Sequence, residues 1–69
     1  MPSSKIIGMR LKRLREEKSY TQEYTATMVG VSPSTIAMYE IGARVPRDET
    51  KIKFSKLYGV TVSSIFFDD

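Results

Sequence analysis

The sequence predicts an all-α domain built from five short helices. Apolar residues recur at helical spacing in the first segment, and helix-capping residues and glycines then punctuate the chain at short intervals. The β-branched cluster at residues 59–65 could form a strand, but an isolated strand has no pairing partner. With 69 residues, the chain is expected to form a single domain, residues 1–69.

The first predicted helix spans residues 5–17, because apolar side chains recur at i, i+4 and i+7 from Ile7 onward. The second begins after Thr21, whose hydroxyl suits an N-cap, and carries an acidic residue in its first turn. It ends before Gly30, a residue type common just after a helix.

The third predicted helix spans residues 33–41, with Ser32 as its N-cap and a proline at its first position. A fourth begins at Asp48 or Glu49, after a proline-containing loop, and runs to Tyr58 before a closing glycine. Thr61 is suited to cap a last short turn, residues 62–66. These boundaries complete the five helices.

The composition argues against an enzyme. The chain contains no histidine and no cysteine, so the commonest metal ligands and the usual proton shuttle at neutral pH are missing. We therefore predict no catalytic residue, no cofactor and no metal site. No apolar run approaches the roughly 20 residues that span a bilayer, and no export signal is recognised. We accordingly expect a cytoplasmic protein without a membrane partner.

Positive charge is unevenly distributed along the chain. The net charge is +3, and the basic residues fall within residues 1–18 and 44–56. Residues 19–43 contain none. Two basic flanks around an uncharged segment favour a polyanionic partner. The alternative is that the basic residues only form two solvated helix faces.

Residues 21–41 contain the most informative pattern, which is two short helices joined by a turn containing Gly30. A short glycine-containing turn between steeply crossing helices is the helix-turn-helix arrangement. Ala26 is small enough to let the helices approach closely, and Val31 can fill the space between them.

Two charged residues lie on faces that are otherwise apolar. Arg15 follows Leu11 by four residues in the first helix, and Glu40 follows Ile36 by four in the third. An unpaired buried charge costs several kcal/mol. We therefore predict that Arg15 and Glu40 form a salt bridge, the alternative being that both side chains extend outward to water.

The sequence resembles the helix-turn-helix DNA-binding domains of phage repressor and Cro type, an XRE-like family with the lambda-repressor-like fold. The resemblance runs from about residue 7 to residue 66 and implies five helices, with the third in the DNA major groove. It also implies a salt bridge at the positions of Arg15 and Glu40. The matching motifs are Leu14-Arg15-Glu16, Thr21-Gln22-Glu23, Gly30-Val31-Ser32, Ile36, Tyr39-Glu40, Gly42, Arg44, Pro46 and residues 58–67.

The resemblance implies that the exposed side of the third helix contacts DNA bases. None of its residues is an arginine, glutamine or asparagine, which make the bidentate base contacts. Specificity is therefore expected from thymine methyl contacts and DNA shape. For Met38, packing against the domain itself or against a partner protein is the alternative. The predicted base-contacting residues are Pro33, Ser34, Ala37 and Met38.

Phosphate contacts are expected around this helix, from side chains that donate hydrogen bonds. The alternatives are plain surface polarity for Gln22, capping alone for Ser32, and solvent or an acidic neighbour for Arg47. The predicted phosphate-contacting residues are Gln22, Ser32, Thr35, Arg44, Arg47 and Arg10.

The apolar end of the chain predicts a self-contact, because two adjacent phenylalanines cannot both face one core. The predicted partners are double-stranded, operator-like and palindromic DNA, a second copy of the chain at least on DNA, and a possible regulatory protein. The predicted function is a transcriptional regulator of repressor type. A protein-interaction module such as an antirepressor or antitoxin is the alternative. The predicted dimer contacts are Val62, Ile65, Phe66 and Phe67.

Overall fold

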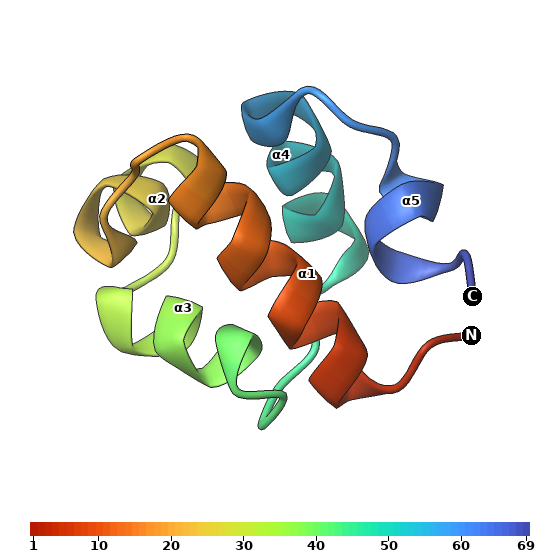
Figure 1. Ribbon diagram of the computed structural model, residues 1–69. Coiled ribbons are helices and arrows are strands. Elements are labelled where there is room, and N and C mark those ends of the chain that lie inside the picture. The colour runs from red at the N-terminus through yellow and green to blue at the C-terminus, as the bar shows by residue number, and fades with distance from the viewer.

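The computed structural model describes residues 1–69 and contains five α-helices and no strand, which confirms the predicted fold class. Figure 1 shows α1 running through the middle of the molecule, with α3 on one side of it and α4 and α5 on the other. The two termini lie side by side. The helices are α1 (Ser4–Glu17), α2 (Gln22–Val29), α3 (Pro33–Glu40), α4 (Asp48–Tyr58) and α5 (Val62–Phe66).

Hydroxyl side chains begin four of the five helices, and each accepts a hydrogen bond from the backbone N–H three residues further on. The helix α4 differs, because its N-cap, Arg47, makes no side-chain bond. Asp48 and Glu49 place negative charge in its first turn instead, which complements the helix dipole. The hydroxyl caps are Ser3, Thr21, Ser32 and Thr61.

The core draws apolar side chains from all five helices around the inner face of α1. The aromatic rings of Phe54 and Tyr58 stack at 5.8 Å, and the rings of Tyr39 and Phe54 meet edge to face at 6.0 Å. The buried apolar residues are Ile7, Leu11, Ala26, Val29, Ile36, Tyr39, Phe54, Tyr58, Ile65 and Phe66.

Two buried hydroxyl groups face the same part of this core. The hydroxyl oxygens of Thr25 and Tyr58 are shielded from solvent, and neither has a hydrogen bond of good geometry. Burial raises the pKa of Tyr58 to about 12, with a smaller opposing effect from the Thr25 hydroxyl. The Tyr58 hydroxyl therefore stays neutral at physiological pH.

A glycine lets α1 cross the end of α3 at backbone distance. A Cβ atom at Gly8 would stand 2.5 Å from the carbonyl oxygen of Glu40 and would also collide with that of Tyr39. Because both obstacles are backbone atoms, neither can swing aside. Apolar periodicity gives Gly8 no role, although a glycine inside a helix is a signal of close approach.

We predict that Gly8→Ala destabilises the domain by about 1–3 kcal/mol, because the clash outweighs the roughly 1 kcal/mol that alanine gains in helix propensity. Urea unfolding followed by circular dichroism measures the change. Met9→Ala is the matched control, since the Met9 side chain is exposed on the same helix and its loss should be nearly neutral. A Gly8→Ala variant as stable as the parent would contradict the close crossing.

Candidate nucleic-acid interface

The turn between α2 and α3 is built by local backbone bonds. Gly30 adopts a left-handed conformation, φ 76° and ψ 35°, and its N–H donates to the carbonyl of Ala26. The N–H of Val31 donates to the same carbonyl at 3.0 Å. The Ser32 hydroxyl then accepts from the N–H of Thr35 at 3.2 Å, and α3 starts within one residue of the turn. The predicted helix-turn-helix is therefore present.

The outer face of α3 is uncharged and open to solvent. Pro33, Ser34 and Met38 are exposed, and Ala37 is half-buried among them. Met38 is 40% accessible, so part of its surface is available to a partner. The opposite face buries Ile36 in the core. The four predicted base-contacting residues thus share one side of the helix, and their contact with DNA remains a prediction.

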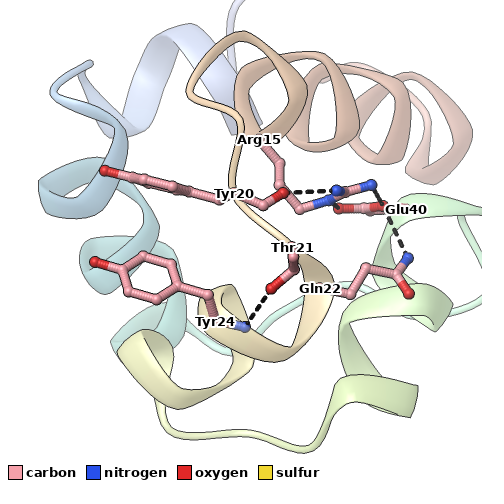
Figure 2. Close-up of polar contacts among 6 residues, drawn as sticks. All are labelled: Arg15, Tyr20, Thr21, Gln22, Tyr24 and Glu40. Carbon is pink, nitrogen blue, oxygen red and sulfur yellow. Dashed lines mark hydrogen bonds and ion pairs between the residues drawn. The ribbon is translucent and has the colours of Figure 1, made fainter.

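A buried ion pair fixes α3 on α1 (Figure 2). The Arg15 guanidinium binds both carboxylate oxygens of Glu40, with Nε 2.7 Å from Oε2 and Nη2 3.1 Å from Oε1. Its Nη1 donates to the Tyr20 carbonyl at 2.9 Å. Only 13% and 3% of the two charged side chains are accessible. This is the pair that the helix faces predict, and its hydrogen bonds raise the pKa of Arg15 above its ordinary value.

Gln22 extends the ion pair to α2. Its Nε2 atom donates to Oε1 of Glu40 at 3.2 Å, so one carboxylate holds side chains from α1 and α2 at the end of α3 (Figure 2). The side chain is half-buried, in the first turn of α2, where backbone N–H groups lack helical partners. Gln22 therefore has a structural role, and a phosphate contact through its remaining amide proton stays a prediction.

A basic cleft of about 350 Å³ lies beside the start of α3. Arg44, Arg47 and Lys53 line it, and none of them forms an ion pair within the protein. The walls also include the hydroxyl-bearing residues Ser32 and Thr35, whose oxygens lie 2.8 Å apart. The cleft therefore combines three cations and one carboxylate, that of Glu49, with hydroxyl groups at the edge of the uncharged face.

Lys53 is the member of this cleft that the sequence analysis missed. Its Nζ atom lies 3.5 Å from the point where a Cβ on Gly30 would stand, which places the ammonium at the helix-turn-helix turn. The only signal in the sequence was the basic character of residues 44–56. Periodicity could not show which lysine of α4 faces the turn, because that depends on how α4 packs on α2.

Arg10 is the predicted phosphate contact that the structure shows engaged within the protein, and its contact with DNA stays a prediction. Its Nη1 atom donates to the backbone carbonyls of Ser64, Ile65 and Asp68 at 3.3, 3.1 and 2.7 Å. These carbonyls lie at the end of α5, where helical partners run out. Arg10 therefore caps α5 from α1 and is occupied by the protein itself.

The predicted self-contact also needs correction for two residues. Ile65 and Phe66 have accessible fractions of 1% and 0%, so they belong to the core and cannot reach a second molecule. Phe67 is 43% accessible and Val62 is half-buried. Of the two adjacent phenylalanines, one faces inward and one outward, because α5 ends at Phe66.

Other kinds of site find little support in the structure. The residues do not gather into a cluster of three or more acidic, cysteine or histidine side chains suited to a metal ion. No helix combines the length and hydrophobicity that a bilayer crossing requires.

We predict that Glu40→Ala destabilises the domain by about 3–5 kcal/mol, since it leaves the Arg15 guanidinium buried without a counter-charge. Urea unfolding gives the value. Glu17→Ala is the matched control, because the Arg13–Glu17 pair spans 3.8 Å between side chains that are more than half exposed. Its loss should cost at most about 0.5 kcal/mol. Equal losses in the two variants would mean that the buried pair has no special role.

Comparison with known proteins places the chain in a family. Residues 11–65 match the helix-turn-helix family. Over 63 residues, the chain is 36% identical to the cryptic phage CTXphi transcriptional repressor RstR of Vibrio cholerae. The match covers 91% of this chain and 57% of that repressor, so the chain spans little more than half the length of this relative.

Two solved structures share the arrangement of helices. The P22 c2 repressor, crystallised in complex with synthetic operator 9T, superposes with a TM-score of 0.88 at 25% identity, over 93% of this chain and 97% of that chain. The restriction-modification controller protein C.AhdI from Aeromonas hydrophila gives a TM-score of 0.84 at 25% identity, over 91% and 96% of the two chains. With its turn, its capped third helix and these matches, the chain belongs to the helix-turn-helix family.

Proposed function

We propose that the chain is a sequence-specific double-stranded DNA-binding domain of a transcriptional regulator, of repressor type. In this proposal α3 enters the major groove by its N-terminal end, and α2 lies across the backbone. Phosphate contacts supply most of the affinity, and contacts at base edges supply the specificity. The similarity to RstR, described as a transcriptional repressor, and to the operator-bound P22 c2 repressor supports this function over a module that binds only proteins.

One observation carries the proposal most directly. The uncharged outer face of α3 stands beside a cleft whose three cationic side chains have no partner within the protein. A duplex meets such a surface with acceptor-rich groove edges opposite α3 and phosphates opposite the cations. The basic residues are therefore placed to grip the backbone while α3 reads the bases.

The composition of α3 also suggests how bases are distinguished. Ser34 can donate to or accept from several base edges, so it discriminates poorly. Ala37 and Met38 offer apolar surface suited to thymine methyl groups. We therefore infer a preference set by methyl contacts and by DNA shape, which is more permissive than readout by an arginine or a glutamine.

We predict a steep salt dependence of binding to selected duplexes, with affinity falling by roughly 10³–10⁵ between about 50 and 200 mM salt if two domains contact about 6–10 phosphates. Arg44→Ala should weaken binding evenly across sequences and lower the salt slope by about 1. Met38→Ala should instead change the ranking of sites. Fluorescence anisotropy with duplexes enriched from a random library measures both.

Arg13→Ala serves as the matched control in these titrations, because Arg13 lies on the exposed side of α1 and pairs with Glu17. Its affinity for DNA should stay close to that of the parent. Unchanged site ranking in Met38→Ala, together with a ranking change in Arg44→Ala, would reverse the roles given to the two residues.

We further propose that two copies associate through the exposed end of α5 when they bind a palindromic operator. Phe67 carries this proposal, because its ring remains exposed while Lys51 holds it against α4, with Nζ 5.1 Å from the ring centroid. A ring that is fixed yet open to solvent loses little side-chain entropy on association. Val62, the first residue of α5, is half-buried.

We predict that Phe67→Asp reduces self-association in sedimentation experiments and weakens binding to a two-site operator more than to a single half-site. Met28→Asp is the control, because Met28 is a similarly exposed apolar residue on α2. Its self-association should match the parent. A Phe67→Asp variant that dimerises normally would place the self-contact elsewhere.

A further inference from the structure

A second cleft, a groove of about 390 Å³, lies between α2 and α4 and shares only Lys53 with the DNA-facing cleft. Figure 2 shows Tyr20 and Tyr24 projecting toward α4, away from the carboxylate of Glu40. We call this cleft the tyrosine groove. The residues that line it are Tyr20, Tyr24, Met28, Lys53, Lys56 and Leu57.

The floor of the tyrosine groove is rigid. The Tyr20 ring lies 4.7 Å from that of Tyr24 and 6.5 Å from that of Tyr58, which is itself in the core. The Tyr20 backbone is held at both ends, since its N–H donates to the Arg15 carbonyl at 3.1 Å and its carbonyl accepts from the Arg15 side chain at 2.9 Å. A ligand bound here would not need to order the rings first.

The outer part of the groove is apolar and unoccupied by the protein. Tyr24 and Met28 are 45% and 51% accessible, and they follow one another by one turn on α2. Aromatic and methionine side chains are enriched at protein interfaces, where their surface is buried on association. Leu57 on the facing helix is half-buried and completes the apolar lining.

The rim of the groove is positively charged. Lys53 and Lys56 line it, no acidic residue does, and neither lysine forms an ion pair in the structure. A second copy of this chain, with its net charge of +3, would bring further positive charge to this rim. An apolar floor under two unpaired cations is complementary to an acidic partner with apolar side chains.

We propose that the tyrosine groove is a docking site for an acidic amphipathic helix of a regulatory protein. Its aromatic or aliphatic anchors would lie on Tyr20, Tyr24 and Met28, and its carboxylates would pair with Lys53 and Lys56. The lining from α2 and α4 offers apolar surface to a helix that presents anchors at i, i+3 and i+4.

Lys53 couples this groove to the DNA-facing cleft, a step that rests on the proposed function. The lysine lines both clefts, with its ammonium at the helix-turn-helix turn. A carboxylate that pairs with Lys53 from the groove removes positive charge from the surface that faces phosphates. Occupation of the groove therefore weakens DNA binding, and the partner acts against the repressor.

Two-dimensional ¹H–¹⁵N NMR with the full chain tests the docking site. The probe is a short acidic peptide with phenylalanine and leucine at helical spacing, compared with the same peptide in which asparagine and glutamine replace the acids. We expect shifts at Tyr20, Tyr24, Met28 and Leu57 with the acidic peptide only. Lys56→Glu should reduce its affinity at least about tenfold, because it reverses a rim charge.

Lys12→Glu is the matched control, since it makes the same change of charge on the exposed side of α1, outside both clefts. It should leave peptide affinity near that of the parent. Equal binding of the neutral peptide, equal loss in both lysine variants, or shifts centred on α3 would overturn the proposal. Groove shifts that grow with protein concentration alone would assign the groove to a second copy and overturn it as well.

The proposed DNA-binding function and the proposed docking site can be overturned independently of each other. DNA titrations of Lys56→Glu, which leaves the DNA-facing cleft intact, should match those of the Lys12→Glu control. Peptide binding without any DNA binding would overturn the proposed function and leave the docking site standing. DNA binding that the peptide does not weaken would overturn the coupling through Lys53.

Discussion

The buried pair between Arg15 and Glu40 is the interaction on which the geometry of the domain depends. Burying two opposite charges costs desolvation energy, and the attraction repays it only when the geometry is good and the remaining donors are satisfied. Here the contact is bidentate, and Gln22 and the Tyr20 carbonyl take further hydrogen bonds. The pair therefore specifies one orientation of α3, which a contact between apolar side chains alone would hold less strictly.

The same pair explains why the outer face of α3 needs no charge. The one charged residue of α3 points inward, and the cations of the chain lie on neighbouring elements. An uncharged face loses less hydration energy than a charged one when it enters a groove and excludes water. In the proposed complex, attraction to the DNA backbone would fall to Arg44, Arg47 and Lys53 at the edge of this face. The proposal therefore separates affinity from base readout in space.

The sequence predicted mainly interactions between residues close together in the chain and missed contacts that depend on how the helices pack. Caps such as Thr21 and Ser32 act within three residues, so local chemistry identified them. The partner of Glu40 could be predicted because a charge on an apolar stripe must be neutralised. Periodicity assigns residues to faces but gives no crossing distances, so Gly8 went unnoticed, and so did the position of Lys53 between two clefts. The contact of Arg10 with the end of α5 was missed for the same reason, because the two meet only in the folded chain.

Two of the three arginines of α1, Arg10 and Arg15, give this helix a role beyond the core. Arg15 holds α3, Arg10 holds α5, and the two positions lie about 140° apart around a helix with 3.6 residues per turn. The 14 residues of α1 extend over roughly 21 Å as one rigid rod. In a dimer that associates through α5, this rod fixes the orientation of each α3 relative to the self-contact. Palindromic half-sites lie about 34–36 Å apart on DNA. The variation in this spacing that such a dimer tolerates therefore depends on how rigidly Arg15 and Arg10 hold α3 and α5 on α1.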